Sequence, residues 1–463
     1  MKRIHGFAVG LAMAMALAAC GGGGGGNSGG GTADGGSGGV PPPTTGVPAL
    51  TLSVRINDQA QAAADSYAVN SGDKVEVQAS EATDWTSKGG DITLNVSTIS
   101  GTTWAAKLIN RVSTASTLTL EASASAESAR NKTVQFVVAG GDARNGSYKV
   151  YATNGSRATL DLNFDVGSYA LSGSTVDDAD ASGNFSADPN EPGTYVFASP
   201  RIATVANTAR FRISGDTMVG AFPFAIVQNS PVTYEVRPFV ASRAMEKNRA
   251  AFDGIYNRFG ITLKSGTSES DISQFEISGG GTVLKRCANQ IIYRIGDCPV
   301  ASILSYTIEA GPTEDTWKMV DGKGALAANF AMAPLDGKHV FLLTGGLLNG
   351  APTERIFRLG VPDSTAWPTG RGYGSATPGS WGRVDVQATT STRTGVNTGG
   401  GSIQTSNTFI PMGSSGGPYG MRGILGTNGE GYFAVNSASL FAIVGANNTD
   451  KGTAGYLQLN LMD

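Results

Sequence analysis

Short stretches of alternating apolar and polar residues run through the chain from about residue 50 to its end. Examples are KVEVQAS (74–80), ATLDLNFDV (158–166) and GYLQLNLMD (455–463). A period of two residues is that of a β-strand, whose successive side chains point to opposite faces of a sheet. Turn-forming residues such as NSGD (70–73) separate these stretches. The pattern therefore predicts an all-β protein.

The expected strands fall into two regions. In residues 48–140 they are short and closely spaced, which predicts an antiparallel β-sandwich. This region resembles the immunoglobulin-like modules of bacterial envelope proteins, although it contains no cysteine for the core disulfide of antibody domains. The residues expected to fill the sandwich core are Val75, Val77, Ile92, Leu94, Val96, Trp104, Leu118, Leu120, Val134, Phe136 and Val138.

Residues 141–463 form the second region, which predicts a larger antiparallel β-barrel or sandwich domain. One stretch, SRAMEKNRAAFDG (242–254), has the residues of a short helix, with Ser242 as its cap and Gly254 as its stop. We expect this helix to join two β halves, 141–240 and 255–463. Gly-x-aromatic triplets recur without a fixed period, which does not support a propeller or solenoid.

The amino terminus carries a recognisable leader. Lys2 and Arg3 precede an apolar run, Phe7 to Leu17, that is too short to span a bilayer comfortably. The tetrapeptide Leu-Ala-Ala-Cys that ends at Cys20 resembles the lipobox of bacterial lipoproteins. The alternative is an ordinary cleaved signal peptide with a chance cysteine.

The lipobox resemblance implies that residues 1–19 are removed and that Cys20 carries lipid chains. Gly21 stands where an aspartate would favour retention in the inner membrane, so the resemblance implies the outer membrane. Several acyl chains anchor a protein stably, whereas one alone binds only marginally. Residues 20–47 are rich in Gly and Ser and end in prolines, which is typical of a flexible tether.

Charge and histidine content exclude several classes of function. The formal net charge is −3 and no Lys/Arg-rich run occurs, whereas a nucleic-acid-binding protein is expected to show a basic face. The chain has two histidines, His5 and His339. If the leader is removed, His339 alone remains, which excludes a multi-histidine metal site within one chain.

Cys287 and Cys298 are the two cysteines beyond the leader. In an exported protein such a pair favours a disulfide, here closing a short hairpin or loop. Free thiols or a metal-binding pair are the alternatives.

The segment PMGSSGGP (411–418) resembles the sequence around the nucleophile of chymotrypsin-like proteases, with Ser415 in the nucleophile position. Ser414 replaces the aspartate of that family, and the one available base, His339, lies too near in sequence for the two-barrel protease layout. A Gly/Ser loop between strands is therefore favoured, and no catalytic residue is assigned.

The densest acidic segment is VDDADASGNFSADPNEPG (176–193). Its alternate oxygen-bearing residues and glycine follow the start of a Ca²⁺-binding loop, but the glutamate of an EF-hand is missing. A solvated acidic turn is the alternative. The candidate ligands are Asp178, Asp180, Ser182 and Asp188, and no other cofactor is expected.

The segment AWPTGRGYGSATPGSWGR (366–383) is rich in glycine, aromatic residues and arginine. This composition suits an exposed binding loop, whereas aromatic residues in strands more often belong to a core. The candidate ligand-binding residues are Trp367, Arg371, Tyr373 and Trp381.

The whole layout, including the phrase FDGIYNRFG (252–260), resembles betaproteobacterial surface lipoproteins with an immunoglobulin-like amino-terminal module. This resemblance implies no activity. We expect a non-enzymatic lipoprotein of the outer membrane that binds a glycan or protein, or that organises the envelope. The alternative is a carbohydrate-active hydrolase that uses carboxylates. Neither membrane leaflet nor oligomeric state follows from the sequence.

Overall fold

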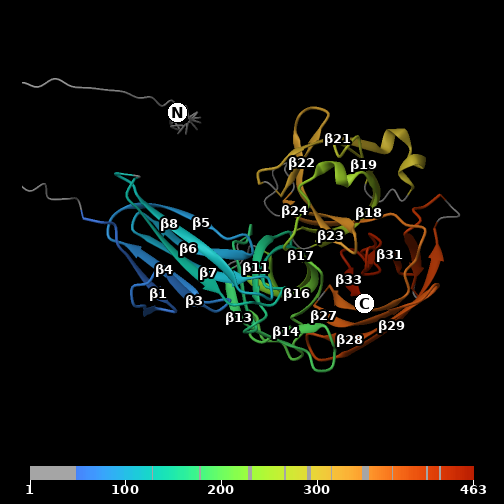
Figure 1. Ribbon diagram of the computed structural model, residues 1–463. Helices are drawn as coiled ribbons and strands as arrows, with labels where there is room; N and C mark the ends of the chain where they lie inside the picture. Colours follow the sequence, from blue (N-terminus) through green and yellow to red (C-terminus); the bar gives the residue numbers. More distant parts are fainter. Residues whose placement is uncertain are drawn as a thin grey trace, which may run out of the picture. The chain divides into compact units, whose positions relative to one another are not determined.

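The computed structural model describes residues 48–463 except 128, 177–178, 228–231, 265–266, 289–292, 314, 347–353, 378, 413–415 and 427–428 (Figure 1). Within these residues it contains β-strands and three 3-10 turns. The all-β prediction is therefore confirmed. No helix of the described part is long and apolar enough to cross a membrane.

The first domain is a sandwich of two sheets. Its five-stranded sheet has the order β2-β1-β4-β7-β6, and its four-stranded sheet has the order β3-β9-β8-β5. The pairs are antiparallel except β3 with β9, which is parallel. The strands are β1 (Leu52–Ile56), β2 (Gln59–Ala60), β3 (Ser66–Val69), β4 (Lys74–Ala79), β5 (Thr83–Lys88), β6 (Ile92–Ser100), β7 (Thr103–Asn110), β8 (Ser116–Ala124) and β9 (Asn131–Val138).

The expected apolar positions of the sandwich lie between its two sheets, with one exception. Val75, Trp104 and Phe136 are at most 2% exposed and belong to one apolar cluster. Val96 was expected in this cluster but is 41% exposed. It lies on the edge strand β6 beside a β-bulge, where the pairing with β7 shifts between Val96 and Thr98.

Three closed barrels follow, each built from eight consecutive antiparallel strands. Barrel 1 contains β10 (Gly146–Ala152), β11 (Arg157–Asn163), β12 (Ser168–Ser172), β13 (Ala181–Ala187), β14 (Thr194–Phe197), β15 (Arg210–Ser214), β16 (Thr217–Val227) and β17 (Thr233–Ser242). Barrel 2 contains β18 (Gly254–Lys264), β19 (Thr267–Ser278), β20 (Val283–Cys287), β21 (Ile303–Ala310), β22 (Trp317–Asp321), β23 (Leu326–Leu335), β24 (Lys338–Gly346) and β25 (Arg355–Pro362). Barrel 3 contains β26 (Gly370–Ala376), β27 (Ser380–Val386), β28 (Thr390–Asn397), β29 (Ser402–Pro411), β30 (Met421–Leu425), β31 (Gly431–Ser437), β32 (Leu440–Gly445) and β33 (Leu457–Met462).

The expected helix over 242–254 does not form. Ser242 is the last residue of β17 and pairs with Thr217 of β16, so the residue expected to cap a helix belongs to the sheet. The connection contains a single 3-10 turn, η1 (Arg249–Phe252), which Asn248 caps by accepting a hydrogen bond from the Ala250 amide. The first expected half corresponds to barrel 1, and the second contains two barrels rather than one.

Barrels 1 and 2 begin with the same Gly-x-Tyr triplet. Gly146 and Gly254 open them at φ +145° and +159°, in the range that favours glycine. Tyr148 donates a hydrogen bond to the Arg144 carbonyl at 2.6 Å, and Tyr256 donates one to the Phe252 carbonyl at 2.9 Å. Two of the recurring Gly-x-aromatic triplets therefore mark the points at which barrels begin.

Each barrel has its own interior cluster, and the three barrels share a further core on their outer faces. The shared core combines Val240 of barrel 1, Phe259 and Phe357 of barrel 2, and Leu440 and Leu459 of barrel 3. Strands beside this core are buried on both faces. All six residues of β33 are buried for this reason, and its polar residues face the interior of barrel 3.

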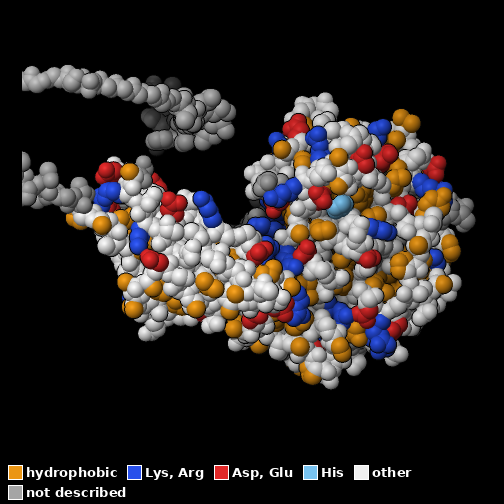
Figure 2. Space-filling model, viewed as in Figure 1, with side chains coloured by type: hydrophobic (Ala, Val, Ile, Leu, Met, Phe, Trp, Pro, Cys, Tyr) orange, Lys and Arg blue, Asp and Glu red, His pale blue; other side chains and the backbone are white. Residues whose placement is uncertain are grey.

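The short 3-10 turns η2 (Ile295–Asp297) and η3 (Val300–Ser302) lie in the connection between β20 and β21. Over the face shown in Figure 2, basic and acidic side chains are interspersed, in keeping with the small net charge.

Candidate functional site

Two of the sequence motifs lie outside the described residues. These are the lipobox with Cys20 and the serine pair of PMGSSGGP, including Ser415. His339 lies in β24, where its Nε2 is 3.2 Å from a carboxylate oxygen of Glu246.

The disulfide between Cys287 and Cys298 is confirmed, with a Cα–Cα distance of 6.0 Å. Both cysteines are buried together with Ile295. The disulfide closes the segment after β20, and the amide of Ile295 in that segment donates a hydrogen bond to Gln274 of β19 at 2.7 Å. The bond thus holds the connection against the wall of barrel 2, which is a structural role.

The proposed calcium ligands do not come together in the described part of the chain. Asp178 lies outside it. Ser182 lies near the start of β13 and Asp188 follows the end of this strand, so about six residue steps place them roughly 20 Å apart. Asp188 forms an ion pair with Arg210 at 2.6 Å, and Asp180 accepts a hydrogen bond from a backbone amide. No group of three or more His, Cys, Asp or Glu suited to a metal ion occurs among the described residues.

The aromatic segment 366–383 was expected to be an exposed loop, but most of it forms β26 and β27. Trp381 is 1% exposed, and its indole nitrogen donates a hydrogen bond to Glu191 at 2.7 Å. Tyr373 packs with Trp381 against barrel 1, and the Arg212 guanidinium lies 4.4 Å from its ring centre. Both rings therefore join barrel 1 to barrel 3 rather than facing a ligand.

The other two candidate binding residues of this segment, Trp367 and Arg371, also contact neighbouring side chains. Trp367 packs edge-on against Phe409, and the guanidinium of Arg422 lies 4.2 Å from its ring centre. Arg371 forms an ion pair with Asp385 at 3.3 Å. The four candidate binding residues are thus dispersed among packing contacts and do not line one site.

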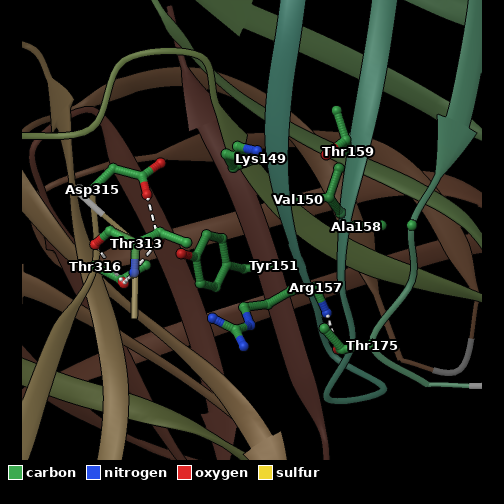
Figure 3. A pocket seen from close by; sticks show the side chains of 11 residues that line it. Lys149, Val150, Tyr151, Arg157, Ala158, Thr159, Thr175, Thr313, Asp315 and Thr316 are labelled. Carbon is green, nitrogen blue, oxygen red and sulfur yellow. Dashed lines mark hydrogen bonds between the residues drawn. The ribbon is translucent and has the colours of Figure 1, made fainter. Parts of the chain in front are cut away.

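A cleft of about 320 Å³ lies elsewhere, between barrel 1 and barrel 2 (Figure 3). One wall is the outer face of the hairpin β10–β11, and the other is the connection between β21 and β22. The residues that line it are Lys149, Val150, Tyr151, Arg157, Ala158, Thr159, Gly173, Thr175, Thr313, Asp315 and Thr316.

Strand register places the polar side chains of the hairpin side by side. Lys149 pairs with Thr159, and Tyr151 pairs with Arg157, so all four project from the same face of the sheet. Tyr151 forms the floor of the cleft and is 4% exposed. Burial raises the pKa of its hydroxyl, which therefore stays protonated as a hydrogen-bond donor at neutral pH.

The opposite wall is held by its own hydrogen bonds. Thr313 donates to the carboxylate of Asp315 at 2.8 Å, and the Thr313 amide donates to the hydroxyl of Thr316 at 3.1 Å. Figure 3 shows Tyr151 pointing across the cleft toward these residues, with Arg157 beside it. These hydrogen bonds link Thr313 to Asp315 and Thr316.

The cleft combines positively charged side chains with hydroxyl groups. Lys149 and Arg157 form no ion pair with any described residue, and Asp315 is the one carboxylate among the described lining residues. Hydroxyls and cations that converge in a cleft bind polar, negatively charged molecules. The described lining residues include no cysteine, serine or histidine to act as an activated nucleophile or its base.

Sequence reasoning missed this site for a physical reason. The turn TNGS (153–156) between two alternating stretches signals a hairpin. The sequence could therefore have predicted that Lys149 and Arg157 lie on the same face of this hairpin. The opposite wall is more than 150 residues away in sequence and belongs to another barrel. Only the packing of the two barrels brings it to the hairpin.

No family model matches the sequence, and no curated protein matches it. Among solved structures, a DUF4784 family protein from Bacteroides caccae matches at 10% sequence identity. The match covers 82% of this chain and 92% of the other, with a TM-score of 0.18.

Proposed function

We propose that this protein is a lipid-anchored, non-enzymatic binding protein of the outer membrane, and that the cleft between barrels 1 and 2 receives an acidic carbohydrate. The observation that carries the binding site is the placement of Lys149 and Arg157, which form no ion pair with a described residue, among the hydroxyl groups of the cleft. The lipobox and the Gly-rich tether support the anchor.

The chemistry of the cleft suits such a ligand. Arg157 presents a planar guanidinium, which binds carboxylates through two parallel hydrogen bonds. The threonine hydroxyls on both walls can donate to and accept from sugar hydroxyls. Asp315, held by Thr313, supplies an acceptor on the far wall. A site with fixed polar groups on two walls orients a ligand and selects among ligands.

We expect an oligogalacturonate to bind the purified protein more tightly than a neutral oligosaccharide of equal length in calorimetric titration. Lys149→Met and Arg157→Met should each weaken binding by about tenfold or more, because each removes a charge-assisted hydrogen bond. Lys88→Met is the matched control, since Lys88 is an exposed strand lysine of the sandwich and its loss should leave affinity unchanged. Equal binding by all three variants, or release of shorter sugars by the protein, would rule out the proposal.

The anchor predicts that Cys20 is the site of lipid attachment. In bacteria fed a palmitate analogue, we expect the protein to be labelled and to sediment with membranes. Cys20→Ala should lose the label and the membrane association, because the thiol that carries the lipid is gone. The double variant Cys287→Ala/Cys298→Ala is the control and should keep the label, since these cysteines form the disulfide. A labelled Cys20→Ala protein would contradict the anchor.

A further inference from the structure

Barrel 2 encloses a cluster of charged side chains in one half of its interior. Strand alternation points Arg258 inward, because its neighbour Phe259 belongs to the outer core. By the same alternation Asp271 and Arg358 point inward, while Ile272 and Phe357 point outward. The other half of the interior is filled by apolar residues, including Tyr256, Phe275, Ile277, Leu284, Phe330 and Phe341.

The register brings these groups to one level of the barrel. Gly260 pairs with Asp271 on one side and with Arg358 on the other, so no side chain separates the carboxylate from that guanidinium. Arg258 pairs directly with Ser273. Arg286 of β20 pairs with Phe275 and shares its face, which makes it a third inward-facing arginine.

Arg358 has a full set of partners. Its Nε is 2.9 Å from an oxygen of Asp271, and its terminal nitrogens donate to the Ile261 carbonyl and to the Thr262 hydroxyl. The other oxygen of Asp271 accepts a hydrogen bond from Arg258. Asp271 is thus shared between two arginines and already accepts a hydrogen bond on each oxygen.

Two polar atoms of the cluster form no hydrogen bond with another described residue. The Nε of Arg258 and the hydroxyl of Ser273 are buried and have no hydrogen-bond partner among the described residues. Arg258 is 7% exposed and Ser273 is fully buried, so bulk water does not solvate them. Buried polar groups in proteins nearly always have a partner, so these two atoms on adjacent strands are available to a bound molecule.

The charge of the cluster is also unbalanced. Three guanidinium groups face one carboxylate, and Arg286 lies within electrostatic reach of Asp271 and of the other two arginines. Lys264, Glu269 and Glu354 stand at the end of the barrel, where Lys264 is 2.6 Å from Glu269 and 3.8 Å from Glu354. Glu269 also lies within electrostatic reach of Arg358, so it offsets part of the excess positive charge of the cluster.

This charge imbalance affects the pKa of Arg258. Burial, together with the like charges of Arg286 and Arg358, lowers the pKa of Arg258 to about 9, although Asp271 opposes the shift. A bound anion would oppose this lowering of the pKa of Arg258. Eight-stranded barrels have room for side chains and at most one small ligand, which restricts the size of that anion.

We infer that the charged half of barrel 2 is a binding site for a small tetrahedral oxyanion, sulfate or phosphate, held by Arg258, Arg286 and Ser273. Three guanidinium groups face Asp271, and Glu269 offsets only part of the remaining positive charge, so an oxyanion with one or two negative charges suits the cluster. Arginine forks donate paired hydrogen bonds to such oxygens, and the free Ser273 hydroxyl adds a third donor. Arg286 is only partly buried, and one of its terminal nitrogens donates a hydrogen bond to the Cys287 carbonyl at 3.3 Å.

The site is tested by calorimetric titration of the purified protein with sodium sulfate and, separately, sodium phosphate, at constant ionic strength maintained with sodium chloride. We expect one anion per chain. Arg286→Met should weaken binding by about tenfold or more. Lys285→Met removes the same charge from the adjacent residue, which points to the other face of β20, and should leave the affinity unchanged. Sulfate has a general stabilising effect on folded proteins, and this effect cancels when Arg286→Met is compared with Lys285→Met.

Ser273→Ala provides a second variant that folds whether or not the inference holds, because the hydroxyl it removes has no partner in the free protein. We expect it to leave the unfolding temperature of the anion-free protein unchanged or slightly higher, and to weaken anion binding by about threefold to tenfold. Absence of binding by the unaltered protein, or equal affinities for Arg286→Met and Lys285→Met, would overturn the inference. Arg157→Met should not change sulfate affinity, so this result is independent of the carbohydrate cleft.

Discussion

Asp271→Asn is expected to destabilise the protein by about 3–5 kcal/mol. Asp271 is 4% exposed and is the carboxylate that Arg258 and Arg358 share inside barrel 2. Removing one partner of a buried ion pair leaves uncompensated buried charge, which costs far more than the loss of an exposed pair. The free energy of unfolding, measured by urea titration followed with circular dichroism, gives the difference.

The matched control is Asp385→Asn. Asp385 also accepts from two arginines, Arg371 and Arg383, but these side chains are partly exposed. Ion pairs of this kind contribute about 0–1 kcal/mol, so the control should change little. Equal effects of the two substitutions would show that the buried carboxylate does not hold the arginine cluster together.

The pH dependence of the free energy of unfolding tests the same prediction in a second way. Burial alone would raise the pKa of this carboxyl, but the guanidinium groups of Arg258, Arg358 and Arg286 outweigh burial and lower it. A carboxyl with a lowered folded-state pKa stabilises the protein above its unfolded pKa of about 3.9, and this contribution is lost as the pH falls through the folded-state pKa. We therefore expect the difference between the unaltered protein and Asp271→Asn to be largest above about pH 5 and to shrink in acid.

Phe259→Ala should have the second large effect, again about 3–5 kcal/mol. Phe259 is fully buried on the outer face of barrel 2, in the core that all three barrels share. Truncation removes apolar contacts and leaves a cavity, since the neighbouring strands are held by their own ladders. Because the core is shared, we expect the barrels to unfold together, in one calorimetric transition that moves to lower temperature.

Val300→Ala is the control for this substitution, since Val300 is 86% exposed and its loss should change stability by less than about 0.5 kcal/mol. Separate transitions for the barrels, with only one of them shifted by Phe259→Ala, would contradict the shared core.

Local pattern was sufficient to predict the all-β class and most of the sandwich core. Val77 and Leu120 lie where alternation places them, because a two-sheet sandwich has one buried and one exposed face. The same rule fails for β33, where Gln458 and Asn460 alternate with leucines but are buried inside barrel 3. A strand that has a barrel interior on one face and another barrel on the other has no solvent face.

Local sequence pattern also could not predict that residues 141–463 form three barrels. Each closure joins the first and last of eight strands, such as β18 with β25, and these pairs are far apart in sequence. The meeting of Arg258 and Asp271 inside barrel 2 likewise depends on strand register, which local pattern does not give. The disulfide was predictable because the lone pair of cysteines leaves one pairing, whereas the cleft needs two barrels packed together.

The most direct test of the proposed binding function is a crystal structure of the protein saturated with an oligogalacturonate. The proposal predicts density for the sugar in the cleft between β10–β11 and Thr313–Thr316, with a carboxylate within hydrogen-bond distance of Arg157 or Lys149. An empty cleft at a ligand concentration that saturates binding in solution, or the sugar bound at another surface, would contradict it.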